Sequence, residues 1–326
     1  MKRILVTGAT GQIGSELAPA LREVYGRDNV VAAGHNRQPD AELWQSGPYC
    51  SLDVRDGVLL RQTVMHYRID TIFHLASMLS AAAEEKPQLA WEINVGGLKN
   101  VLETAREYGC AVFFPSSIAV FGSGAPQENT PQMTIQRPGT LYGISKLAGE
   151  LLCDYYHRRF GVDTRGLRFP GLLSTRTLPG GGTTDYAVEI FYAALKEGRY
   201  RCYLASDTRL DMMYMPDALL AAKTLMEADG TKLIHRNAYN LTALNFTPEE
   251  LAAQIRMSLP EFFISYEIDP LRQAIADSWP RHMDDTAART EWGWAPSCDF
   301  SATVADMLDK LAIKLGRTRE DDHGAG

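Results

Sequence analysis

Several features that would place the protein in other classes are missing from the sequence. Its five cysteines are few for 326 residues, lie far apart and form no CxxC pair, which argues against a disulfide framework and a cysteine-rich zinc site. No apolar run approaches the roughly 18–20 residues of a membrane span, and the N-terminal residues lack the apolar stretch of a signal peptide. Basic residues number 33 against 40 acidic ones, a net charge of -7, so the charge balance of a nucleic-acid-binding protein is absent. We therefore expect a soluble cytoplasmic protein without a metal, membrane or nucleic-acid partner.

What is present in the first half is an alternation of short apolar strands and helical segments. Expected strands span 3–7, 29–33, 71–75, 111–115 and 163–169, and expected helices span 11–25, 56–67, 89–108 and 142–160. Strands separated by helices run parallel, because each crossover returns the chain to the same end of the sheet. The pattern predicts an α/β fold with a Rossmann-type, doubly wound parallel sheet.

After residue 169 the alternation weakens. Residues 178–182 are rich in proline and glycine, and a helix with proline at its first position is expected from 247 to 257. We predict a dinucleotide-binding domain over 1–169 and a smaller, mostly substrate-binding domain over 170–326, from which late segments can return to the sheet. The polar residues 317–326 are expected to form a disordered tail.

A glycine-rich turn follows the first expected strand and opens the first expected helix. Its spacing, G-x-x-G-x-x-G, places glycine at Gly8, Gly11 and Gly14. Glycines here allow a tight turn and let backbone N–H groups approach a pyrophosphate at the positive end of the helix. The turn predicts a dinucleotide site in which Gln12 and Ile13 take part.

The second strand ends without the acidic residue that usually binds the adenosine ribose of NAD. Gly34 is followed by His35, Asn36 and Arg37. Asn36 or His35 could bind the ribose 2′-hydroxyl, whereas Arg37 could accept a 2′-phosphate, so these residues leave NAD and NADP both open. Asp53, which follows a further short segment that we expect to be a strand, could reach the adenine amino group.

A tyrosine and a lysine lie one helical turn apart at Tyr142 and Lys146, and two serines, Ser116 and Ser117, follow a strand. The carboxyl ends of parallel strands are where ligands bind in open α/β sheets. A phenol is a weak base at neutral pH, and a neighbouring ammonium favours its ionised form. The set predicts proton transfer by Tyr142, with a serine hydroxyl holding the substrate oxygen.

These motifs resemble the extended short-chain dehydrogenase/reductase superfamily, which contains UDP-galactose epimerase. Within it, several blocks are similar to the short-chain type of L-threonine 3-dehydrogenase, and the unusual string G-G-G-T-T-D-Y-A carries most of the specificity. The blocks are residues 73–81, 135–143, 179–187, 239–241, 246–251 and 274–280.

The resemblance implies oxidation of the threonine side-chain hydroxyl with NAD to 2-amino-3-oxobutyrate. It makes Tyr142 the base, Ser117 the group that orients the oxygen, and Lys146 a ligand of the nicotinamide ribose. Further cofactor-binding residues implied are Asp53, Val54, Leu75, Ala76, Ser77 and Pro170. Further substrate-binding residues are Ser77, Ser80, Thr183 and Thr184, the last two on a loop that closes over the substrate. It also implies a homodimer. Because Gly34 replaces the family's usual acidic residue, NADP remains open, although no basic residue lies within the glycine turn.

Two other functions stay under consideration. A nucleotide-sugar epimerase or dehydratase would share Ser117, Tyr142 and Lys146, and Arg209 lies where such enzymes often hold a phosphate. A dehydratase would usually carry an Asp-Glu pair after the serine, whereas Ile118 and Ala119 follow here. A non-catalytic NAD(P)-sensing regulator is the third; such proteins tend to lose the tyrosine or the lysine, and this chain keeps both.

Overall fold

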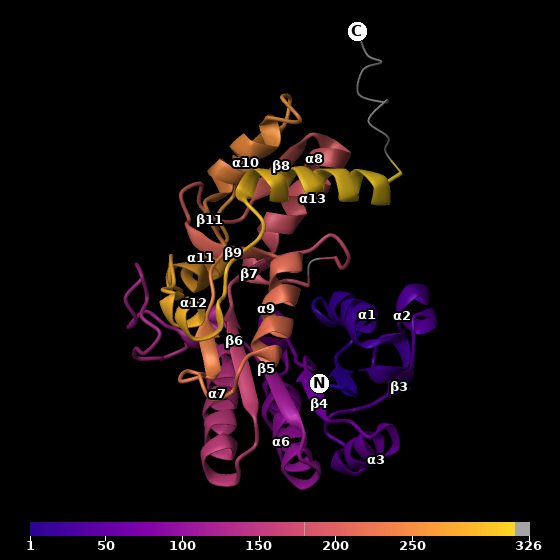
Figure 1. Cartoon of the computed structure of the whole chain (residues 1–326). Coiled ribbons are helices and arrows are strands. Elements are labelled where there is room, and N and C mark those ends of the chain that lie inside the picture. Colours follow the sequence, from indigo (N-terminus) through magenta and orange to yellow (C-terminus); the bar gives the residue numbers. More distant parts are fainter. Residues whose placement is uncertain (179, 317–326) are drawn as a thin grey trace.

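A computed structural model describes residues 1–178 and 180–316 of the chain (Figure 1). The described residues form one seven-stranded sheet in the order β10-β6-β5-β4-β1-β2-β3, in which every neighbouring pair is parallel. Its strands are β1 (Ile4–Thr7), β2 (Val30–Gly34), β3 (Tyr49–Ser51), β4 (Thr71–His74), β5 (Ala111–Ser117), β6 (Thr164–Phe169) and β10 (Asn237–Asn240). The predicted α/β fold with a parallel central sheet is confirmed.

Helices cover both faces of this sheet, because successive apolar side chains along a strand point to opposite faces and both sets are buried. Ile4 and Val6 of β1 pack with helices α1 and α9 on one face. Leu5, between them, packs with α3, α6 and α7 on the other. The helices of the first half are α1 (Gly14–Tyr25), α2 (Ala41–Gln45), α3 (Gly57–Tyr67), α4 (Ser80–Glu85), α5 (Pro87–Trp91), α6 (Gly97–Tyr108) and α7 (Leu141–Phe160), and α9 (Met215–Glu227) joins them from the second half.

The segment expected as a helix over 89–108 is helical throughout, but it is not one regular α-helix. It consists of α5, a turn of π-helix at Glu92–Gly96, and α6. A π-helical turn inserts one extra residue per turn and is frequent at functional sites. Here it places Asn94 in the interior, where 5% of the residue is exposed.

A second region is built around two small sheets at the carboxyl end of the main sheet (Figure 1). One sheet joins β7 (Gly171–Leu173), β9 (Leu210–Tyr214) and β11 (Leu244–Phe246), and the other joins β8 (Arg199–Cys202) and β12 (Phe263–Tyr266). Its helices are α8 (Tyr186–Glu197), α10 (Pro248–Arg256), α11 (Pro270–Asp277), α12 (Thr286–Trp292) and α13 (Phe300–Lys314).

The chain passes between the two regions more than once. Strand β10 returns to the main sheet beside β6, and α9 packs on that sheet. The division at residue 169 therefore remains our proposal for the domain organisation. The expected tail, 317–326, lies outside the described residues.

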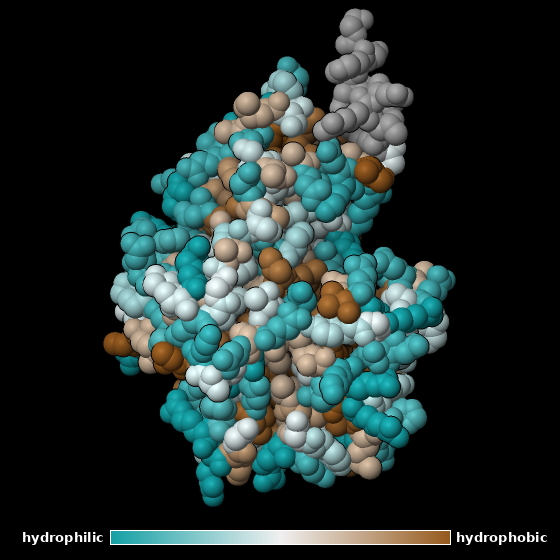
Figure 2. All heavy atoms as spheres, in the orientation of Figure 1, coloured by the Kyte–Doolittle hydropathy of each residue, from teal (hydrophilic) through white to brown (hydrophobic). Residues whose placement is uncertain are grey.

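The surface is mostly hydrophilic on the face that Figure 2 shows, with apolar side chains in small groups. Among residues 1–178 and 180–316, no helix has the length and apolar character needed to cross a membrane.

Candidate active site

The carboxyl ends of five parallel strands bring the predicted site residues to one edge of the main sheet. Because these strands are in register and parallel, Thr7 pairs with Ala33 of β2 and with His74 of β4, and Ser117 pairs with Phe169 of β6. The second region stands over this same edge (Figure 1). Residues from β1, β2, β4, β5 and β6 therefore meet at one place, as the sequence predicts.

The glycine turn forms a tight cradle for backbone reasons. Gly8 has φ of 66°, and a side-chain carbon placed on it would lie 2.6 Å from the Ala76 backbone nitrogen. A side-chain carbon on Gly14 would lie 2.7 Å from the Ala9 Cα. In the described part of the chain no side chain caps α1, whose N-cap residue is Ile13. An uncapped, glycine-lined helix start fits the pyrophosphate of a dinucleotide.

Tyr142, Ser117 and Lys146 lie together. The Lys146 Nζ lies 5.5 Å from the centre of the Tyr142 ring, and the Ser117 hydroxyl is close enough to lower the pKa of the Tyr142 phenol. Burial outweighs this influence of Ser117 and raises the pKa of the phenol to about 12. The phenol therefore stays protonated until positive charge or a proton acceptor favours its ionised form.

Burial has the opposite effect on Lys146, because the charged form of a lysine is the protonated one. Desolvation lowers the pKa of Lys146 to about 8, and the Glu150 carboxylate offsets part of the shift. The Lys146 Nζ donates a 2.8 Å hydrogen bond to the Pro115 carbonyl oxygen of β5. This bond holds the ammonium beside the strand that carries Ser117.

A buried charge network lies behind the catalytic set, and sequence reasoning missed it. Glu150 accepts hydrogen bonds from the Ser116 hydroxyl and from Arg168, whose Nη2 is 2.8 Å from Oε2 and whose Nε is 3.0 Å from Oε1. The Arg168 Nη1 also donates to Asn240 on β10. Glu150 lies one helical turn after Lys146, a spacing that could have indicated the network.

Asn94 is a second residue that the sequence analysis missed. Its amide nitrogen donates to the Met78 carbonyl at 3.1 Å and to the Ser145 hydroxyl at 3.0 Å, and its amide oxygen accepts from the Met78 backbone N–H and the Ser77 hydroxyl. Asn94 thus ties the segment after β4 to the residue preceding Lys146. The available signal was a polar residue between two apolar ones, Ile93 and Val95, and just before the glycine pair at 96 and 97.

The segment proposed as a closing loop lies against the start of α4. Side-chain carbons placed on Gly180 and Gly181 would lie 3.8 Å and 3.7 Å from side-chain atoms of Leu79 and Ala81. The Asp185 carboxylate accepts from the Gly181 and Gly182 N–H groups, both at 2.7 Å. The loop therefore meets the Ser77–Ser80 segment, as expected if both contact one substrate.

Thr183 and Thr184 occupy the short helical turn Thr183–Asp185 that follows these glycines. Thr183 is buried, and Thr184 is partly exposed. A side-chain carbon placed on Gly171, at the start of β7, would lie 2.9 Å from the Thr184 Cβ. Thr184 therefore packs directly over the segment that follows β6.

The remaining predicted cofactor residues lie around the same edge. Leu75 and Ala76 follow β4, where their N–H groups lie 3.1 Å from the Thr7 carbonyl oxygen and 3.5 Å from the Thr7 hydroxyl. Pro170 connects β6 to β7, and Gln12 lies in the glycine turn. Their roles remain predictions.

Asp53 and Val54 follow β3. The carboxylate of Asp53 is bound by Arg55, with Nη2 2.6 Å from Oδ2, and lies 3.5 Å from His35. Arg55 and the nearby His35 hold the pKa of Asp53 below its usual value. Val54 is buried against Gly97 at the start of α6. If Asp53 contacts the adenine, its carboxylate must bind the adenine and Arg55 at the same time.

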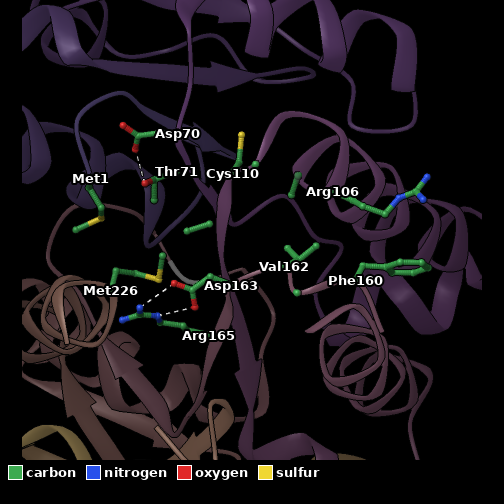
Figure 3. Close-up of a pocket in the computed structure, with 14 residues that line it drawn as sticks. Met1, Asp70, Thr71, Arg106, Cys110, Phe160, Val162, Asp163, Arg165 and Met226 are labelled. Carbon is green, nitrogen blue, oxygen red and sulfur yellow. Dashed lines mark hydrogen bonds and ion pairs between the residues drawn. The ribbon is translucent and has the colours of Figure 1, made fainter. Parts of the chain in front are cut away.

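A cavity of about 490 Å³ lies at the opposite edge of the sheet, where β1, β4, β5 and β6 begin (Figure 3). Its charged side chains already have partners: Arg165 binds Asp163 at 2.8 Å, and Arg106 binds Glu103 at 2.7 Å. Ligands of open α/β sheets bind at the carboxyl edge. We therefore place the active site at the carboxyl edge.

Comparison with known proteins shows the family of the chain. The model of the NAD dependent epimerase/dehydratase family matches residues 4–241. The chain belongs to this family. An uncharacterized epimerase/dehydratase of Staphylococcus saprophyticus is 51% identical over 314 residues, covering 96% of this chain and 98% of the relative. Membership of this family supports a nicotinamide cofactor, for which the glycine turn remains our predicted binding site.

Solved structures of high similarity include two L-threonine dehydrogenases. The enzyme from Clostridium difficile is 54% identical with a TM-score of 0.95, covering 96% of this chain and 98% of that one. The GalE-like enzyme from Cupriavidus necator, in its holo form, is 48% identical with a TM-score of 0.92, and the match covers 95% of this chain and 99% of that one.

Proposed function

We propose that this protein is an L-threonine 3-dehydrogenase. The observation that carries the proposal is 54% identity over nearly the whole chain to the Clostridium difficile L-threonine dehydrogenase, in a protein that keeps Ser117, Tyr142 and Lys146 together at the ligand-binding edge. The loop at Gly180–Asp185 supports a small substrate, because it lies close over the Leu79–Ala81 segment.

In the proposed reaction, Tyr142 takes the proton of the threonine hydroxyl and Ser117 holds the same oxygen by a hydrogen bond. The oxidised nicotinamide, when bound, accepts the hydride from the third carbon of threonine. Because burial raises the pKa of Tyr142 to about 12, removing its proton depends on the neighbouring positive charge of Lys146. The product, 2-amino-3-oxobutyrate, is a β-keto acid and loses CO₂ readily.

The remaining groups position the substrate and exclude water. We assign Ser77, Ser80, Thr183 and Thr184 to the amino acid, with the two threonines on the side of its carboxylate. Closure of this loop would remove water from the reacting atoms and so protect hydride transfer. NAD as the physiological cofactor, a homodimer and a cytoplasmic location complete the proposal.

The nucleotide-sugar epimerase is the alternative that the experiment must separate. One observation weighs against it: Arg209, the candidate phosphate ligand, is bound by Glu250 at 2.5 Å and by the Asn245 side-chain oxygen at 3.0 Å. Its charge is already compensated, so a sugar-nucleotide phosphate would have to displace Glu250.

The test measures reduced nicotinamide with purified protein and L-threonine, first with NAD and then with NADP, and with UDP-galactose in a parallel reaction. A rise in absorbance with threonine supports the proposal. Interconversion of the nucleotide sugar without any reaction of threonine would overturn it in favour of an epimerase.

A further inference from the structure

The adenosine end of the cofactor groove differs from a typical NAD site at Gly34, the last residue of β2. A side-chain carbon placed there would lie 2.5 Å from the Tyr49 hydroxyl and 3.2 Å from the Thr10 hydroxyl. Two hydroxyl groups therefore face the place where an NAD site usually holds an Asp or Glu that binds the ribose diol. Without a carboxylate, the repulsion that excludes a 2′-phosphate is missing.

Positive charge is available beside this position. Arg37 lies exposed in the segment that follows β2, and it has no ion pair or hydrogen bond within residues 1–178 and 180–316. Tyr49 likewise shows no hydrogen bond of its hydroxyl in that part of the chain. A free guanidinium and free hydroxyl donors are the groups that bind phosphate oxygens.

The carboxylate beside His35, Asp53, is already bound by another arginine. Asp53 is bound by Arg55 through two nitrogens, Nε at 3.0 Å and Nη2 at 2.6 Å from Oδ2, and its other neighbour is His35 at 3.5 Å. The carboxylate of Asp53 is thus compensated by Arg55. The guanidinium of Arg37, which has no ion pair or hydrogen bond in the described part of the chain, can therefore bind a phosphate on the ribose.

We propose that this protein binds NADP(H) as well as NAD(H), with Arg37 and the Tyr49 hydroxyl holding the 2′-phosphate beside Gly34. The inference rests on the family and its dinucleotide site, and not on threonine as the substrate. It is tested by binding alone, so its failure and the failure of the threonine proposal are distinguishable.

The experiment is calorimetric titration of the full chain with NADPH and with NADH, without substrate and at low ionic strength. The expected result is an NADPH dissociation constant within about tenfold of that for NADH, because one charge-assisted contact replaces the hydrogen bonds of the ribose diol. A larger preference for NADH, or no binding of either dinucleotide, overturns the proposal.

One variant tests the role of Arg37, and a second serves as its control. R37A should weaken NADPH binding about tenfold, the effect of losing one charge-assisted hydrogen bond, and leave NADH binding within about twofold. R199A, which removes an exposed arginine from β8, is the matched control and should change neither. Equal weakening of both dinucleotides by R37A would overturn the assignment of Arg37.

The variant G34D combined with Y49F restores the acidic residue and removes the hydroxyl that would obstruct it. It should lose NADPH binding at least about tenfold relative to Y49F, through repulsion between carboxylate and phosphate, while retaining NADH. Y49F alone keeps the ring and supplies the reference for folding. An unchanged NADPH affinity in the double variant would overturn the role of Gly34.

Discussion

Removing Arg168 should destabilise the fold strongly, because it leaves a buried carboxylate without its cation. The side chains of Arg168 and Glu150 are 7% and 4% exposed, and two nitrogens of Arg168 bond the carboxylate. In the variant Arg168→Met, Glu150 keeps hydrogen bonds from the Ser116 hydroxyl and the Gln136 amide, the latter at 3.2 Å, and the charge of Lys146 one helical turn away, but it loses both bonds to a cation. Breaking a buried pair from one side costs about 3–5 kcal/mol.

The expected loss in the free energy of unfolding is therefore about 3–5 kcal/mol, measured by urea denaturation at one protein concentration. The double variant Glu150→Gln/Arg168→Met should recover at least about 1 kcal/mol of it, since no charge is then left unpaired. Arg201→Met is the control: its pair with Glu267 is 72% and 70% exposed, and its loss should cost less than about 1 kcal/mol.

A loss of less than about 1 kcal/mol for Arg168→Met would refute this reasoning. It would mean that water or another cation reaches Glu150 when the guanidinium is removed. If the double variant were less stable than Arg168→Met, the buried charge would not be the source of the cost.

Three further predictions concern the site. Tyr142→Phe should reduce turnover at least about 100-fold, the usual contribution of a general base, with cofactor affinity unchanged in a binding titration; substantial residual activity would contradict the base assignment. Thr184→Ala should raise the KM for threonine far more than the KM for the cofactor. If steady-state kinetics showed equal increases in the two KM values, the proposed role of the loop in substrate binding would be contradicted. His74, whose Nδ1 lies 3.0 Å from the Thr7 hydroxyl, has its pKa lowered to about 3 by burial and by Lys146. Below pH 6.5 the unfolded chain therefore binds a proton that the folded chain does not. The free energy of unfolding should fall by up to about 1.4 kcal/mol per pH unit towards pH 3. The variant His74→Asn should lack this contribution, and urea unfolding with the same pH dependence in both proteins would contradict the prediction.

The central sheet could be predicted because its signal is local. Strands such as Thr71–His74 are short apolar runs between helical segments, and this alternation alone requires a parallel arrangement. The glycine turn was readable for the same reason, since strand, turn and helix follow one another directly. Expected and observed element ends differ by a few residues; α1, for example, begins at Gly14 rather than at residue 11.

What the sequence could not supply was the set of contacts that only the folded chain creates. Glu150 and Arg168 are 18 residues apart and meet because α7 packs beside β6. Asn94 reaches Ser145 only through the π-helical turn, which no apolar periodicity indicates. The short helix α2 was missed because five residues carry too little periodicity to detect.

The most direct test of the central claim follows the hydrogen that leaves the substrate. The protein is incubated with NAD and L-threonine that carries deuterium on its third carbon, and the reduced cofactor is analysed by mass spectrometry. We predict NADH one mass unit heavier, which Tyr142→Phe should fail to produce. Unlabelled NADH, or no NADH at all, would contradict the proposed oxidation of threonine by this site.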